Sequence, residues 1–202
     1  MLAPRTAAAL VVLAAVLAVS STTSAEAQES MPGMSAPVTI HKGAIFTAAD
    51  VHFMQGMIAH HSQAIYMTHM AASHGASPRL LKLATKIDQS QVAEIHLMQD
   101  WLRRNGQSVP DTSSWRTMHM PGMLTAQQLA ALDSAKGSDF DRDFLTLMIQ
   151  HHEGALAMVS KLLNTPGAAQ DVNVNVFAND VQQVQTAEIG IMHAMLDQMS
   201  ND

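Results

Sequence analysis

The feature that most constrains this 202-residue chain is an internal repeat. Residues 57–67 and residues 148–158 share the pattern Met-Ile-x-His-His-x-x-Ala-x-x-Met, and corresponding positions lie 91 residues apart (Met57 against Met148). A second pattern, Gln-x-x-Glu-Ile-x-x-Met-x-x-x-Leu, occurs at residues 91–102 and again at 185–196. The chain therefore contains two tandem copies of a unit that has two sequence blocks, and any fold must accommodate two similar halves.

Each half has the pattern of two amphipathic helices joined by a short break. Thr47 and Ser138 are predicted N-caps of equivalent helices, each followed three residues later by an aspartate. In the first half Gly75 ends the first helix, and Ser77 and Pro78 are the predicted N-cap and first residue of the second. Residues 164–167 separate those of the second half, although the strand-like alternation of residues 171–176 leaves the start of the last helix open.

Four amphipathic helices of about 25 residues, with short connections within each pair and one long crossover, predict an all-α, ferritin-like four-helix bundle made of two tandem helix hairpins. We expect the bundle to span residues 47–202. Repeat one covers 47–105, a linker covers 106–137, and repeat two covers 138–202. The linker contains a short helix that begins with a capping box at Thr125-x-x-Gln128.

The first 27 residues are typical of a secretory signal peptide. Arg5 precedes an apolar run at residues 7–19, and Ala25-Glu26-Ala27 fits the cleavage site. The alternative is an uncleaved anchor, but the run falls short of the about 20 residues that a membrane span needs. Cleavage leaves a flexible, Met-containing segment at 28–46 before the bundle, in an exported protein without a membrane anchor. We expect a periplasmic location in a Gram-negative host and secretion otherwise.

Composition excludes several functions and favours one kind of chemistry. The chain has no cysteine, which excludes disulfides, thiolate zinc sites and iron–sulfur clusters. A net charge of −6 with 14% charged residues does not fit a nucleic-acid-binding protein. The chain has 16 methionines and 11 histidines against 4% aromatic residues, and such richness in thioether and imidazole favours soft-metal binding.

The predicted core faces carry polar residues at matching places in both halves. A histidine pair on one helix (His60–His61, His151–His152) stands opposite a glutamate on the next (Glu94, Glu188). Because adjacent helical residues diverge by about 100°, we expect one histidine of each pair to face the glutamate and the other to face a flank. Metal ligation by these histidines and ordinary core hydrogen bonding remain alternatives, with the glutamates orienting the imidazoles in either case.

Methionines also occur where no helix is expected. The sequence Met-Pro-Gly-Met stands at residues 31–34 and again at 120–123, where Met118-His119 precede it. Proline and glycine disfavour helix, so helix packing does not explain these methionines. Thioether sulfur suits Cu(I) and Ag(I). We expect the linker loop to lie outside the core and to bind a soft metal. The alternative is a flexible, oxidation-prone loop that merely docks on the bundle.

Taken together, the repeated blocks and the linker segment 120–125 resemble the bacterial family known as domain of unknown function 305, over about residues 47–202. That family is described as ferritin-like and includes CopM-like periplasmic proteins that bind copper and silver and contribute to copper tolerance. The resemblance implies an exported copper-binding bundle. Glu153 follows the second histidine pair where Ser62 follows the first, so the two halves need not be equivalent as sites.

The first functional hypothesis is an exported protein that sequesters or carries Cu(I), with Ag(I) able to substitute. Glu94 and Glu188 are expected to orient the imidazoles. The candidate metal ligands are Met118, His119, Met120, Met123, Met57, His60, His61, Met67, Met148, His151, His152 and Met158. Metal ions are the expected partners, and a copper-handling protein partner is not identified by the sequence.

Two alternatives come from other classes. One is a structural or partner-binding bundle whose His–Glu pairs only specify the core. The other is a redox enzyme; a di-iron site needs Glu-x-x-His motifs, which this chain lacks, so only copper redox chemistry stays open. No catalytic residues are predicted.

Overall fold

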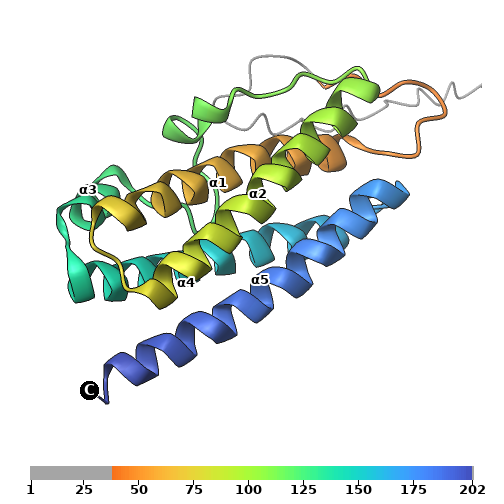
Figure 1. The fold of residues 1–202 in the computed structure, drawn as a ribbon. Coiled ribbons are helices and arrows are strands. Elements are labelled where there is room, and N and C mark those ends of the chain that lie inside the picture. The colour runs from red at the N-terminus through yellow and green to blue at the C-terminus, as the bar shows by residue number, and fades with distance from the viewer. Residues whose placement is uncertain (1–37, 202) are drawn as a thin grey trace, which may run out of the picture. The chain divides into compact units, whose positions relative to one another are not determined.

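The computed structural model describes residues 38–201, and there the chain is all-helical, as predicted (Figure 1). The predicted signal peptide, the Met-Pro-Gly-Met motif at 31–34 and most of the segment 28–46 lie outside these residues. The elements are α1 (Ala48–Ser73), α2 (Pro78–Arg104), the 3-10 helix η1 (Thr112–Arg116), α3 (Ala126–Ser134), α4 (Gly137–Leu163) and α5 (Val172–Met199).

Side-chain caps explain where most of these helices begin. Thr47 forms a capping box with Asp50, Ser77 caps α2 ahead of Pro78, and Thr125 forms the predicted box at α3. The expected cap at Ser138 is wrong, because α4 already begins at Gly137 and its N-cap residue makes no side-chain cap bond.

The stretch at 171–176, whose sequence alternates like a strand, forms the start of α5. Asp171 accepts hydrogen bonds from the backbone N–H groups of Asn173 and Val174, which caps a helix that begins at Val172. The alternating valines are therefore helical, and two of them, Val172 and Val176, lie exposed on its surface.

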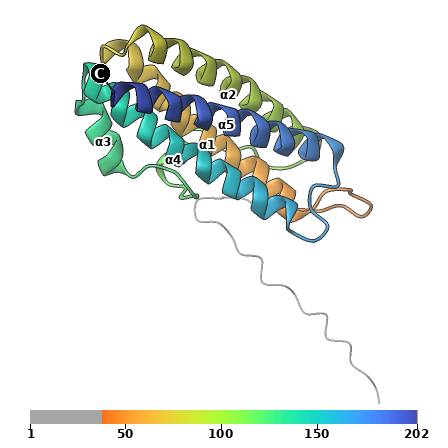
Figure 2. The same cartoon turned by 90° about the horizontal axis from the view of Figure 1, so that it is seen from below.

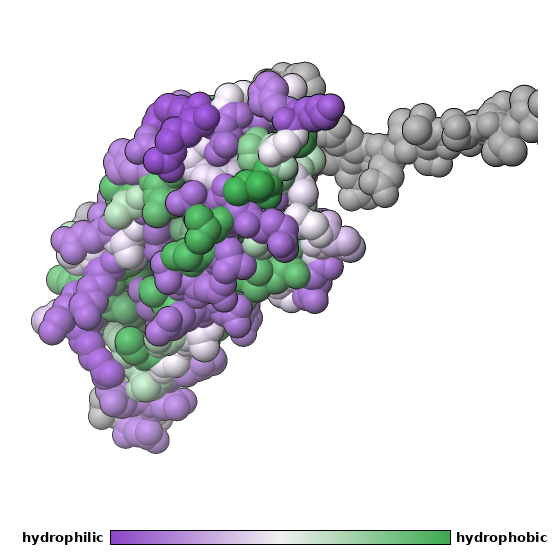
Figure 3. Space-filling model, turned by 90° about the vertical axis from the view of Figure 1, so that its right-hand side faces the viewer, coloured by the Kyte–Doolittle hydropathy of each residue, from purple (hydrophilic) through white to green (hydrophobic). Residues whose placement is uncertain are grey.

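The four long helices form two hairpins that meet through α1 and α4. α2 packs along α1, α5 packs along α4, and α1 contacts α4 (Figure 2). One apolar cluster joins the first half of α1 to the last half of α4, and a second joins the last half of α1 to the first half of α4. α1 and α4 are therefore antiparallel, with apolar clusters at both ends of the bundle and the histidine pairs between them. The face seen in Figure 3 is largely hydrophilic with separate apolar patches, as expected when most large apolar side chains are inside.

Equivalent aspartates connect each hairpin to the other. Asp50 of α1 accepts a hydrogen bond from the backbone N–H of Ala169, in the turn between α4 and α5, with 2.6 Å between N and Oδ1. Asp141 of α4 accepts from the backbone N–H of Ser77, in the turn between α1 and α2, at 3.2 Å. This reciprocal pairing reflects the sequence repeat and relates the two hairpins by an approximate twofold axis.

Candidate metal centre

All four repeated histidines lie fully buried at the middle of the bundle. His60 of α1 and His151 of α4 meet across the helix contact, with 3.8 Å between their ring centroids. The expectation that one histidine of each pair faces a flank is therefore wrong. The side of α1 that we expected to be a flank is covered by α4. The angular positions of residues on one helix do not show which neighbouring helix covers them.

The other two histidines have the carboxylate partners that the sequence predicted. His61 Nε2 donates to Glu94 Oε2 at 2.5 Å, and His152 Nε2 donates to Glu188 Oε2 at 2.7 Å. The glutamate side chains keep 20% and 12% of their surface exposed, so each is partly exposed while its carboxylate pairs with a buried imidazole. The predicted pairing is confirmed in both repeats, and it fixes the orientation of both rings.

Burial keeps the two central imidazoles neutral. Desolvation, followed by the neighbouring His61, lowers the pKa of His60 from 6.5 to about 3. Desolvation and then His60 lower the pKa of His151 well below its ordinary value. Neutral imidazole is the form that binds metals, because one ring nitrogen then carries a free lone pair.

Several ring nitrogens in this layer have no hydrogen-bond partner. His60 Nε2 donates to the carbonyl oxygen of Pro121 at 3.0 Å, which leaves Nδ1 as the nitrogen with the lone pair. That Nδ1 and both ring nitrogens of His151 are buried and unpartnered. Buried polar atoms without partners are uncommon, and here they have the donor chemistry of metal ligands.

The linker methionines gather against α1 and α4. Met118 and Met120 are buried with Ala59 of α1, and Met123 and Met158 pack around them. The expectation that this loop lies outside the core is therefore wrong, because Met118 and Met120 are buried against the helices. Four of the candidate thioether ligands thus form one group, called here the Met cluster: Met118, Met120, Met123 and Met158.

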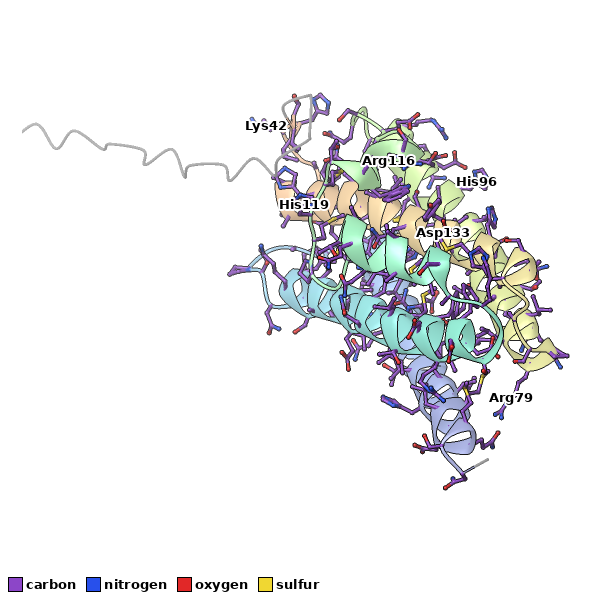
Figure 4. The ribbon with its side chains drawn as sticks, turned by 90° about the vertical axis from the view of Figure 1, so that its left-hand side faces the viewer. Lys42, Arg79, His96, Arg116, His119 and Asp133 are labelled. Carbon is purple, nitrogen blue, oxygen red and sulfur yellow. The ribbon has the colours of Figure 1, made fainter. Side chains whose placement is uncertain are left out.

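The remaining candidates lie elsewhere. His119 is exposed on the surface of the linker (Figure 4). Met57 is buried in the apolar cluster at one end of the bundle, and Met67 and Met148 are buried in the cluster at the other end. These three methionines have ordinary apolar packing partners and do not join the Met cluster.

Backbone contacts hold the loop in place. The side-chain amide of Gln63 donates to the carbonyl oxygen of Leu124 at 3.1 Å and accepts from its N–H at 2.7 Å. On the opposite helix, Gly154 lies directly under Pro121 and Gly122, where a Cβ would come within 2.0 Å of the Pro121 carbonyl oxygen. Neither Gln63 nor Gly154 was among the sequence candidates, because their role depends on a contact with a distant loop.

Trp115 is a further neighbour that the sequence did not single out. It packs against the Met cluster from η1, and the guanidinium of Arg116 lies 4.4 Å from its ring centroid. A tryptophan three residues before Met118 gave no periodic signal, since η1 is too short to show one.

The carboxylates and imidazoles of the described residues do not gather into one larger group. Within residues 38–201, no group of three or more His, Asp or Glu side chains has an arrangement that could hold a metal ion.

Comparison with known proteins places the chain in a family. The model of the family described as domain of unknown function (DUF305) matches residues 50–200. The chain belongs to the DUF305 family. No curated protein sequence matches this DUF305 chain.

Solved structures share its fold. A DUF305 protein of Streptomyces coelicolor, described as secreted, is 26% identical, with a TM-score of 0.66 over 75% of this chain and 94% of its own. A DUF305 fragment from Deinococcus radiodurans is 28% identical, with a TM-score of 0.67 over 76% and 98%. CopM in a Cu(II)-bound form is 32% identical, with a TM-score of 0.60 over 74% and 96%, and CopM has also been solved with Cu(I) and with Ag.

Proposed function

We propose that this DUF305 protein is an exported metal-binding protein that sequesters or carries Cu(I), with Ag(I) able to substitute, and so contributes to copper tolerance. The observation that carries the proposal is the Met cluster: four thioethers from a loop and a helix gather where His60 hydrogen-bonds to that loop, and His60 and the adjacent His151 have buried ring nitrogens without partners. Thioether and imidazole gathered in one place are the donors that a soft metal ion prefers.

The donor set fits a soft monovalent ion. Thioether sulfur binds Cu(I) and Ag(I) without losing a proton, and it cannot be closed off as a disulfide in an oxidising compartment. Imidazole is the second donor, and the hydrogen bond from His60 to Pro121 connects the central histidines to the loop that carries Met120 and Met123. We assign the Met cluster as the primary ligand group and His60 and His151 as the nearby nitrogen donors.

Relatives add support of a different kind. CopM, which is about a third identical and shares the fold, has been solved with Cu(II), Cu(I) and Ag bound. A Streptomyces coelicolor relative is described as secreted, which agrees with the predicted signal peptide. In residues 38–201, no helix has both the length and the apolar character that crossing a membrane requires. We place the protein in the periplasm, or outside the cell where the host has one membrane.

An anaerobic titration of the purified protein with Cu(I), against a chromogenic chelator, tests the proposal. The wild type should withdraw Cu(I) from the chelator in a saturable way. The triple substitution Met118→Leu, Met120→Leu, Met123→Leu should weaken binding strongly. As a matched control, Met67→Leu with Met148→Leu changes two buried methionines in an apolar cluster and should leave the Cu(I) affinity unchanged.

Other outcomes favour the alternative functions. A wild type that leaves all Cu(I) with the chelator would support a structural or partner-binding bundle in which the His–Glu pairs only specify the core. Equal losses from the triple variant and from the control pair would contradict the assignment of the Met cluster.

A further inference from the structure

The two residues that hold the linker loop in place, Gln63 and Gly154, occupy equivalent positions in the two repeats. Gln63 lies two residues after the first histidine pair, and Gly154 lies two residues after the second. The approximate twofold axis between α1 and α4 would place identical residues symmetrically about the loop. The chain instead has a large hydrogen-bonding side chain at one position and no side chain at the other.

Gln63 supplies the attachment on the α1 side. Its buried amide makes two hydrogen bonds with the backbone of Leu124, one through each of its polar atoms, as a neighbouring strand would. This satisfies a backbone N–H and C=O that are buried by docking of the loop. The loop end next to Met123 is thereby fixed in one position along α1.

Gly154 supplies space on the α4 side. The backbone of Pro121 and Gly122 lies against the helix so closely that a Cβ on Gly154 would stand 2.4 Å from the Pro121 carbonyl carbon and 2.5 Å from the Gly122 Cα. Gly122 has a φ of +77°, and a Cβ there would approach the Gln150 carbonyl oxygen to 2.6 Å. Because every one of these neighbours is backbone, a side chain at either glycine would displace the loop.

We infer that Gln63 and Gly154 are positioning residues for the soft-metal site, and that they hold the loop in its binding arrangement before a metal ion arrives. This inference rests on the proposed function. A loop already seated does not have to be ordered on binding, and avoiding that entropic cost raises affinity.

Substitution of Gly154 tests this role against a matched glycine. Gly154→Ala should weaken Ag(I) binding about tenfold or more in a chelator competition, a change of about 1.4 kcal/mol. Gly190→Ala, at a helical glycine of α5 with no atom within 4 Å of the added Cβ, should leave the affinity unchanged. Gln63→Ala should weaken binding in the same direction without adding any steric clash.

A stability control separates positioning from general destabilisation. Leu162→Ala opens a cavity in the apolar cluster that contains the end of α4 and should lower the free energy of unfolding without changing the Ag(I) affinity. If the affinity of Gly154→Ala and Gln63→Ala matches that of the wild type, the positioning role is wrong while the proposed function stands. If the wild type itself binds no Ag(I), both are overturned.

Discussion

At the scale of single residues, the four central histidines show how burial selects partners for a polar side chain. His61 and His152 have carboxylates, His60 has a backbone carbonyl, and His151 has no hydrogen-bond partner. A buried imidazole without a partner is costly for stability, so its presence at the contact between the two repeats is better explained by binding than by packing.

The metal-free protein should lose stability in acid because of His60 and His151. Both stay neutral in the folded chain, whereas the unfolded chain protonates them below about pH 6.5. The unfolded state then binds more protons, so the free energy of unfolding falls as the pH drops, by up to about 1.4 kcal/mol per pH unit for each group. Urea unfolding at about pH 7 and about pH 5 measures this. His60→Gln with His151→Gln should show a shallower dependence, and an identical slope would count against the account.

Removal of a paired histidine should destabilise the fold. His61→Ala leaves Glu94 without its partner, at a cost of about 1–3 kcal/mol in the free energy of unfolding. His152→Ala should behave alike through Glu188. His96→Ala, at an exposed position on α2, is the control and should cost less than about 0.5 kcal/mol. Equal effects at His61 and His96 in denaturant unfolding would refute the pairing.

At the scale of elements, the linker loop behaves as part of the core. Met120 is only 8% exposed, so its removal should be felt in stability as well as in binding. Met120→Leu preserves volume and should cost less than about 1.5 kcal/mol, whereas Met120→Ala should cost about 2–5 kcal/mol. Both should weaken Cu(I) binding. Thermal unfolding and chelator competition on the same samples separate the two effects, and tight binding by the leucine variant would contradict a thioether role.

Helices were predictable from the sequence wherever a local signal decides the structure. The capping boxes at Thr47 and Thr125, and the cap at Ser77, act within one turn and were identified correctly. The prediction of an N-cap at Ser138 failed because the backbone angles of the preceding turn decide which residue begins the helix. The valines after Asp171 were ambiguous because a short apolar alternation is typical of a strand, whereas the cap at Asp171 starts a helix that leaves Val172 and Val176 exposed.

The candidate site was less predictable because it depends on contacts between distant segments. The His–Glu pairs follow from the two helices of each hairpin, so their spacing was sufficient. The meeting of His60 with His151 requires the antiparallel contact of α1 with α4. The burial of the loop requires the absence of a side chain at Gly154. No local sequence pattern indicates that a distant loop packs on this glycine.

At the scale of the whole molecule, two hairpins are joined by a reciprocal pair of aspartates. Asp50 accepts from the backbone N–H of Thr47 in the capping box and from the backbone N–H of Ala169 in the opposite hairpin, so Asp50→Ala should cost more than about 2 kcal/mol in the free energy of unfolding. Asp139→Ala, at an exposed aspartate in the first turn of α4, should cost less than about 1 kcal/mol. Denaturant unfolding compares the two, and similar losses would show that Asp50 contributes only a helix-end charge.

The central claim is that soft-metal binding depends on the Met cluster. X-ray absorption at the copper edge of the Cu(I)-loaded protein tests it most directly, because it distinguishes sulfur from nitrogen among the ligands. The account predicts a shell that contains thioether sulfur together with imidazole nitrogen, and loss of the sulfur in the Met118→Leu, Met120→Leu, Met123→Leu variant. A shell of nitrogen and oxygen alone, unchanged in that variant, would contradict it.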